Sequence, residues 1–372
     1  MKRTTYRAAG AVIVIGAVIG SAAPAYASSI TQTAADNSAF FGGFTGVAAV
    51  SATDGWAVGG NGNGMIQRYN GVGWVAVASP DLLAGGTNTW AGLAGVDMLS
   101  ASSAFAVGRT SAASDDSAAV AERWNGTQWS RLTVPRAAGT DTSFTGVKAF
   151  SASDAWAVGE GGTWSHRLTL AMHWNGSQWT AVPTPSPGTR NNWVTAVDGT
   201  GPADVWAVGY TLDLPYGNRF RQSLVMHYDG GTWTQVPSPN NGSTYLYDVA
   251  ALTASDAWAV GYGSDGGAFV LRWNGTAWSS APAPPGLSSL TSVAARSDSD
   301  VWVTGGDANG APALGHFNGS TWTVTPVTVT GGVGLPYLCA ITKAGPSAEF
   351  AVGYQADGTT GQSGNIAFRI AG

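Results

Sequence analysis

The sequence contains little cysteine and little lysine, and each shortage excludes a class of protein. One cysteine, Cys339, in 372 residues excludes an internal disulfide framework and a metal centre built from cysteines. Three lysines and a formal net charge of −5 exclude the broad basic surface that binds a nucleic-acid backbone, so no nucleic-acid partner is expected. Only 10% of the residues are charged while 44% are hydrophobic, which indicates a folded chain with a core.

Glycine and tryptophan are abundant instead. The chain holds 53 glycines, 17 prolines and 17 tryptophans, a composition typical of β structure with many turns. No stretch after the N-terminal segment is long and apolar enough to span a membrane.

Residues 1–27 have the pattern of a secretory signal peptide. Lys2, Arg3 and Arg7 precede an apolar run at 8–19, and Ala25-Tyr26-Ala27 follows as a cleavage site. Twelve apolar residues fall short of the ~20 that cross a bilayer, so we expect no membrane insertion. The sequence therefore predicts a secreted, extracellular protein comprising residues 28–372. Removal of three positive charges would leave its net charge at about −8.

The chain after residue 27 consists of seven repeats. An aromatic marker residue recurs at intervals of 44 to 52 residues, at Trp56, Phe105, Trp156, Trp206, Trp258, Trp302 and Phe350. A glycine follows each marker by three residues, and a valine or isoleucine precedes it by nine. Such a period predicts repeated supersecondary units rather than independent domains.

Each repeat is predicted to form four short strands. In the fifth repeat these are expected at 246–252, 256–262, 269–273 and 277–281, with Asn274-Gly275 as the tight turn before the last strand. Equivalent Asn-Gly or Asp-Gly turns occur in five other repeats. We therefore predict an all-β fold, a seven-bladed β-propeller of four-stranded blades forming one domain over residues 28–372.

The last repeat has three predicted strands. We expect the mature N-terminus, around residues 29–33, to add the missing outer strand and close the ring, because an open edge would otherwise separate the first and last blades.

The repeats resemble those of kelch and tectonin-type propellers. The shared elements are an AVGG or AVGY strand, a downstream aromatic with Asn-Gly, and a closing W-x-x-V-P, as at Trp179 to Pro183 and Trp233 to Pro237. The pattern is most similar to propellers exported by high-GC Gram-positive bacteria. This resemblance implies the fold and leaves the function open, because propellers include lectins, enzymes and scaffolds.

Residues that recur in every repeat are interpreted as structural. Fourteen of the 17 tryptophans fall at repeat positions and are predicted to form the core between blades. Five repeats carry an aspartate two residues before the marker and a basic residue on the third strand, which we interpret as a pair within the blade. The alternative is a ring of ligand-binding cations. The pairs are Asp54 with Arg68, Asp154 with His173, Asp204 with His227, Asp256 with Arg272, and Asp300 with His316.

The candidate binding site comes from residues outside the repeat pattern. Three tryptophans, Trp90, Trp164 and Trp193, are expected in loops on one face of the ring, and the third and fourth repeats hold further candidates there. Aromatic faces beside amide and guanidinium donors suit neutral or acidic sugar rings. In the alternative interpretation, these aromatics pack the loops onto the scaffold. The predicted ligand-binding residues are Trp164, His166, Arg167, Arg190, Asn191, Trp193, Tyr210, Tyr216, Arg219 and Arg221.

These features predict a monomeric, non-catalytic binding module, lectin-like in its recognition of cell-surface or environmental glycans. No cofactor, metal or catalytic residue is predicted, because no His-Glu-x-x-His, Gly-x-Ser-x-Gly or P-loop pattern is present. One alternative is a polysaccharide lyase or hydrolase with a site assembled across blades, for example from Glu160, His166 and Tyr210. A protein-interaction scaffold is the other.

Overall fold

The computed structural model describes residues 29–371 except 38–41, 61, 84–87, 113–116, 137–140, 164, 214–220, 241, 265, 331–333 and 357–362. The expected signal peptide at 1–27 lies outside this part of the chain. All regular elements within it are β-strands. Nowhere in these residues is there a helix with the length and apolar character to cross a membrane.

The strands form antiparallel groups of four, each in chain order. The first three groups are β2 (Phe44–Ser51), β3 (Asp54–Gly59), β4 (Met65–Tyr69) and β5 (Trp74–Ala76); β6 (Asn88–Ser100), β7 (Ser103–Ala112), β8 (Ser117–Trp124) and β9 (Trp129–Leu132); and β10 (Asp141–Ser151), β11 (Asp154–Thr163), β12 (His166–Trp174) and β13 (Trp179–Val182). The next three are β14 (Asn191–Gly201), β15 (Asp204–Leu212), β16 (Arg221–Tyr228) and β17 (Trp233–Gln235); β18 (Thr244–Thr253), β19 (Asp256–Gly263), β20 (Gly267–Trp273) and β21 (Trp278–Ser280); and β22 (Leu287–Ser297), β23 (Asp300–Asp307), β24 (Pro312–Phe317) and β25 (Trp322–Pro326).

The last sheet combines the two ends of the described chain. Strands β26 (Leu335–Lys343), β27 (Ala348–Ala356) and β28 (Ser363–Ala371) are completed by β1 (Ser29–Thr33), which pairs antiparallel with β28. The strand expected at 29–33 is thus present and forms the outer strand of this sheet. Elsewhere, a single parallel bridge between Arg167 and Asn191 joins β10–β13 and β14–β17 into a continuous eight-stranded sheet.

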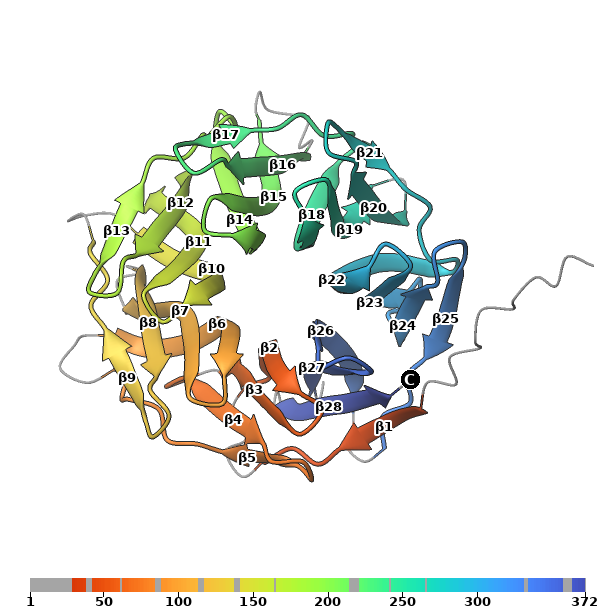
Figure 1. Cartoon of the computed structure of the whole chain (residues 1–372), viewed down its shortest axis with the longest axis horizontal. Coiled ribbons are helices and arrows are strands. Elements are labelled where there is room, and N and C mark those ends of the chain that lie inside the picture. The colour runs from red at the N-terminus through yellow and green to blue at the C-terminus, as the bar shows by residue number, and fades with distance from the viewer. Residues whose placement is uncertain are drawn as a thin grey trace, which may run out of the picture.

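The sheets are arranged around a common centre, with the first strand of each innermost and its last strand at the periphery (Figure 1). The repeated glycine of the second strand reflects close packing against the innermost strand. A Cβ on Gly261, for example, would lie 1.8 Å from the carbonyl oxygen of Tyr245 on β18. Because the equivalent glycines meet the same obstacle, the residue recurs in every repeat.

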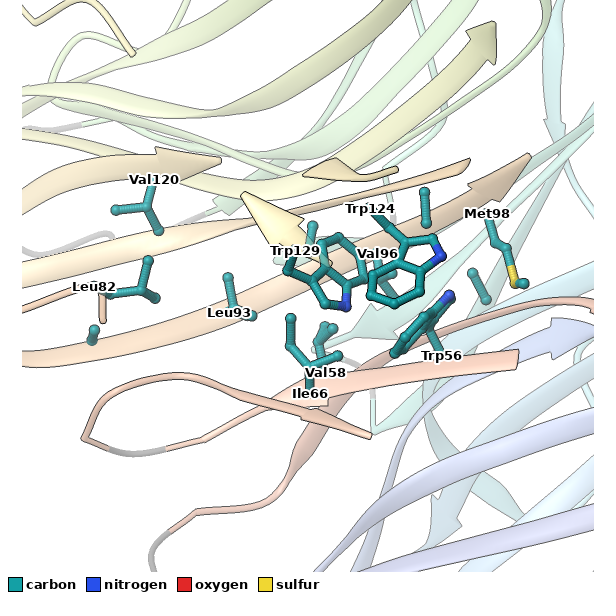
Figure 2. Packing of buried hydrophobic residues seen from close by; sticks show 14 residues of the cluster. Trp56, Val58, Ile66, Leu82, Leu93, Val96, Met98, Val120, Trp124 and Trp129 are labelled. Atoms are coloured by element: carbon teal, nitrogen blue, oxygen red, sulfur yellow. The ribbon is translucent and has the colours of Figure 1, made fainter. Parts of the chain in front are cut away.

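The core lies between adjacent sheets, as the repeated tryptophans predict. The marker residue of one sheet packs on aromatic rings from the third and fourth strands of the next. Trp56 lies 4.9 Å from Trp124 and 5.1 Å from Trp129, measured between ring centres (Figure 2). Trp206 makes the same contacts with Trp273 and Trp278. Of the fourteen repeat tryptophans, twelve are buried, while Trp273 and Trp322 are half-buried.

The predicted pairs between aspartate and a basic residue are confirmed in all five sheets that carry them. The nitrogen–oxygen distances lie between 2.7 Å, for His227 with Asp204, and 3.1 Å, for Arg272 with Asp256. In the β6–β9 sheet, Ser103 replaces the aspartate, and the Arg123 guanidinium lies over the Phe105 ring, 5.8 Å from its centre. Engagement of these side chains within their own sheets argues against a ring of ligand-binding cations.

Side chains of the innermost strands tie each sheet to the next. Thr45 donates its hydroxyl to the carbonyl oxygen of Leu93, on the innermost strand of the following sheet, at 2.8 Å. Thr145 and Thr195 each make the equivalent bond to the sheet that follows their own. The carboxylates of Asp97 and Asp198 accept hydrogen bonds from backbone N–H groups of the following innermost strand, both at 2.8 Å. The inner ends of the sheets are therefore held together by polar contacts as well as by the aromatic core.

Candidate functional site

In six of the described sheets, one pair of residues faces each other across the first and second strands beside the repeated glycine. The residue types of this pair differ from sheet to sheet. Its second-strand member directly follows the repeated glycine. The pairs are Gly92 with Arg109, Ser143 with Glu160, Trp193 with Tyr210, Tyr245 with Tyr262, Ser289 with Gly306, and Tyr337 with Tyr354. Since these pairs share one register position, they lie at the same end of their sheets. We call them the rim positions.

Aromatic rim residues of two neighbouring sheets form a continuous cluster. The ring centre of Tyr210 lies 4.9 Å from Trp193 and 5.0 Å from Tyr245. Tyr245 also lies 5.9 Å from Tyr262 and 6.2 Å from Tyr247. All five residues, which we call the aromatic cluster, are half-buried, so their rings are packed together and still reach solvent.

Arg221 on β16 adds hydrogen-bond donors to the aromatic cluster. Its Nη1 donates to the Tyr245 hydroxyl at 2.7 Å, and its guanidinium carbon lies 5.1 Å from the centre of the same ring. Removal from solvent is the largest of the effects that raise the pKa of Tyr210 to about 12, with smaller contributions from Tyr247 and Glu160. The Tyr210 phenol is therefore neutral at ordinary pH and offers a hydroxyl.

A charged group lies beside the aromatic cluster. Buried Glu160 on β11 lies 4.0 Å from Arg167 on β12, and Arg167 also lies 3.6 Å from Asp141 on β10. Burial raises the pKa of Glu160, while Arg167, Arg109 and a hydrogen bond from Ser143 act in the opposite direction. The carboxyl is thus held among positive neighbours at the edge of a pocket.

That pocket has a volume of about 230 Å³ and lies between the first three sheets. Its lining includes Thr45, Trp90, Arg109, Ser143 and Glu160. The Arg109 guanidinium lies over the Trp90 ring, 5.4 Å from its centre. An aromatic wall, a guanidinium and a carboxyl therefore converge on one small cavity.

The predicted loop positions of Trp90 and Trp193 are wrong. Trp90 lies in β6 and Trp193 in β14, because these innermost strands extend beyond the common length of the repeat and pair with β7 and β15. His166, Arg167, Asn191, Tyr210 and Arg221 likewise lie in strands. Trp164, Tyr216 and Arg219 fall outside the described residues. The described residues at these positions therefore belong to extensions of the sheets.

The structure brings together some of the predicted site residues and separates others. Trp193, Tyr210 and Arg221 meet in the aromatic cluster. Arg167 lies in the charged group. Asn191 is buried, and its side-chain oxygen accepts the backbone N–H of Arg167 at 2.9 Å, which ties β14 to β12. Arg190 precedes β14 and donates its backbone N–H to Leu212, while His166 is exposed at the start of β12.

Sequence reasoning missed the rim residues Tyr245 and Tyr262, and it did not include Trp90, Arg109 or Glu160 among the ligand-binding candidates. For Tyr262, Arg109 and Glu160 the signal is a position that varies between repeats directly after an invariant glycine. It also missed the inner channel, a cavity of about 250 Å³ lined by the innermost strand of every sheet. Both lysines that follow residue 27 line this channel.

The channel contains a network of opposite charges. Lys148 Nζ lies 2.8 Å from Asp198 and 4.0 Å from Asp97, and the Asp198 charge is the largest influence raising the pKa of Lys148. Asp248 accepts hydrogen bonds from Ser292 at 2.5 Å and from the backbone N–H of Val293 at 2.9 Å, while its removal from solvent raises its pKa to about 6. These groups are engaged with one another across sheets. No cluster of three metal-ligating side chains occurs in the described ranges.

Comparison with known proteins identifies the class of fold. No protein-family model matches the chain, and no curated protein sequence matches it. Among solved structures, YCF48 bound to a D1 peptide matches with a TM-score of 0.57 and 15% identity, covering 93% of this chain and 97% of that one. YCF48 from Cyanidioschyzon merolae gives a TM-score of 0.56 at 15% identity, with coverage of 91% and 98%.

An ulvan lyase, a polysaccharide lyase bound to a GlcA(1-4)Rha3S unit, matches with a TM-score of 0.60 and 12% identity, covering 92% of this chain and 96% of that one. These neighbours are β-propeller proteins. The chain therefore has an all-β fold of the β-propeller class, built from four-stranded sheets.

Proposed function

We propose that this chain is a secreted seven-bladed β-propeller that binds carbohydrate without catalysis, at the end of the ring that carries the rim positions. In this proposal residues 1–27 are a signal peptide, residues 28–372 form one domain, and β1 closes the ring. Pairing of β1 with β28 over five residue pairs supports the closure. The seven repeats of the sequence, of the kelch and tectonin-like kind, support the number of blades.

The aromatic cluster is the observation that carries the proposed activity. Half-buried rings, tilted against one another, present apolar faces to solvent, which suit the C–H faces of sugar rings. The neutral Tyr210 hydroxyl and the Arg221 guanidinium stand at the border of those faces, where they can bond sugar hydroxyls. A rigid sheet framework fixes the cluster in advance, which lowers the entropy lost on binding.

Binding of the mature protein to a glycan and polysaccharide array tests this proposal. We expect Trp193→Ala to weaken binding of the recognised glycan by about tenfold or more, since it removes one stacking face. Tyr337→Ala is the matched control, because Tyr337 occupies the equivalent rim position of another sheet and is 44% exposed. Thermal melting of both variants separates lost binding from lost folding. Absence of binding throughout the array, or a Trp193→Ala variant that binds like the wild type, would overturn the proposal.

A polysaccharide-active enzyme is the second candidate, favoured by one observation. Glu160 is a buried carboxyl with a raised pKa, close enough to Tyr210 to influence the pKa of that phenol. A carboxyl and a phenol placed together can act as acid and base. Incubation of each bound polysaccharide with the wild type and with Glu160→Gln, followed by assay for new reducing ends, distinguishes the two functions. Release of products that depends on Glu160 would replace the binding proposal with an enzymatic one.

A further inference from the structure

We propose that the pocket lined by Trp90, Arg109 and Glu160 receives a uronate unit, so that the protein selects acidic polysaccharides. This inference rests on the proposed function and names its ligand class. The aromatic cluster would hold neighbouring sugars of the same chain, and the Arg109 guanidinium would bind the uronate carboxylate.

Arg109 has the properties of an anion-binding residue. Its side chain is exposed, and its guanidinium carbon lies over the Trp90 ring, 5.4 Å from the ring centre. Among the described residues, no hydrogen bond joins its guanidinium to another protein group. A guanidinium binds a carboxylate through two parallel hydrogen bonds, and a planar, stacked guanidinium loses little freedom in doing so.

The other walls of the pocket suit a single sugar unit. Trp90 is half-buried and presents an aromatic wall, and Thr45 and Ser143 add hydroxyl groups to the lining. The volume of about 230 Å³ is small, which fits one monosaccharide better than an extended chain. The remaining sugars of a polysaccharide must then lie outside the pocket.

The aromatic cluster offers a surface for those sugars, because its Trp193–Tyr210 pair lies at the rim of the sheet that β12 and β14 join to the sheet of Ser143 and Glu160. The Glu160 carboxyl lines the pocket and also influences the pKa of Tyr210, which belongs to the cluster. Pocket and cluster are thus adjacent rim features of consecutive sheets. A chain with its uronate on Arg109 would continue over Tyr210 and Trp193.

Charge balance gives the site a dependence on pH. The groups that act on Glu160 are Arg109 from β7, Ser143 from β10, Arg167 from β12 and Tyr210 from β15, and Asp141 on β10 lies 3.6 Å from Arg167. Two guanidinium groups therefore oppose two carboxyls, and a bound uronate adds a third carboxylate. Protonated Glu160 would donate a hydrogen bond to that carboxylate, whereas ionised Glu160 would repel it. Selection for acidic chains should accordingly weaken as Glu160 loses its proton.

The test compares each acidic polysaccharide with its own neutral form. Polygalacturonate, alginate and hyaluronan oligosaccharides are used before and after reduction of their carboxyl groups to alcohols. We expect the wild type to bind at least one acidic form about tenfold more tightly than the reduced form. Arg109→Gln should reduce this preference to within about twofold. Arg131→Gln, which removes the same charge from an exposed position on β9, should retain the preference.

The possible results separate the inference from the proposed function. Equal binding of acidic and reduced forms by the wild type overturns the inference and leaves carbohydrate binding intact. A preference for the acidic form that survives in Arg109→Gln also overturns the inference and leaves carbohydrate binding intact. Binding of neither form to any member of the panel overturns both. A preference that falls with rising pH in the wild type and stays constant in Glu160→Gln supports the assigned role of Glu160.

Discussion

The ring of Phe350 meets the ring of Tyr69 edge to face, with 4.7 Å between their centres. Phe350 is the marker residue of the last sheet, and Tyr69 lies on the third strand of the first described four-strand sheet. Trp74 on the fourth strand completes the contact, 5.4 Å from Phe350. The last sheet therefore packs on the β2–β5 sheet in the same way that Trp56 packs on the sheet that follows it.

Removal of residues 28–35 should destabilise the protein strongly. The deleted segment pairs along β28, buries Ile30 against the core, and supplies Thr33, whose hydroxyl accepts the Trp74 indole N–H at 3.1 Å. Loss of these contacts is worth several kcal/mol, and we expect a fall in Tm of about 5 °C or more. Calorimetry of chains that begin at residues 28 and 36 measures the difference. Equal Tm values would contradict closure by β1.

Glu122 should make the protein less stable as pH rises. It is buried on β8, and burial raises its pKa from 4.5 to about 7 against the opposing hydrogen bond from Ser79. Because the folded state holds the proton more tightly, stability falls between about pH 4.5 and pH 7, by a total of about 3 kcal/mol.

Glu122→Gln keeps an acceptor for Ser79 and removes the titration. Urea denaturation should show the variant to be more stable than the wild type at pH 8 and close to it at pH 5. Asp248, with its own raised pKa of about 6, leaves a residual pH dependence in this variant. Equal stability of variant and wild type at pH 8 would show that ionisation of Glu122 does not destabilise the folded protein.

The two channel lysines should differ sharply in their importance for stability. Lys148→Met leaves the carboxylates of Asp198 and Asp97 without their cation, which should cost about 3 kcal/mol of unfolding free energy. Lys343 has no carboxylate within ion-pair distance in the described part of the chain. Lys343→Met should therefore change stability by less than about 1 kcal/mol. Chemical denaturation of both variants checks this contrast, and similar losses would contradict it.

Gly261→Ala should be severely destabilising, whereas Gly267→Ala in the next strand should not. A methyl group on Gly261 would collide with the Tyr245 carbonyl oxygen, while one on Gly267 would meet no atom within 4 Å. We expect a loss of about 3 kcal/mol or more at Gly261 and less than about 1 kcal/mol at Gly267. Soluble yield and Tm report the difference. A tolerated alanine at Gly261 would mean that the β18 backbone can move aside.

Sequence repetition predicted the framework because each framework residue meets the same surroundings in every repeat. The pairing of Asp54 with Arg68 and the tryptophan core follow from such positions, and the strand at 29–33 follows from the strand that the last repeat lacks. The site was predicted only in part. Trp193, Tyr210 and Arg221 stand out by residue type, but their contact with Tyr245 joins two sheets, which requires the arrangement of the sheets around their centre.

Features that occur only once were not predicted from the sequence, because they too depend on how the sheets are arranged. Lys148 and Asp198 lie on innermost strands of different sheets, so their approach to 2.8 Å leaves no periodic signal. Arg109 and Trp90 are separated by a strand reversal, and their stacking depends on an extension of β6 that resembles a loop in sequence.

The alternation of an invariant glycine with a freely varying neighbour has a further consequence. Folding depends on the glycine and on the aromatic contacts between sheets, whereas the rim residue beside it contributes little to either. The rim residue can therefore differ from sheet to sheet on one common scaffold. Ligand preference in such a protein would diverge quickly during evolution while its architecture stayed constant.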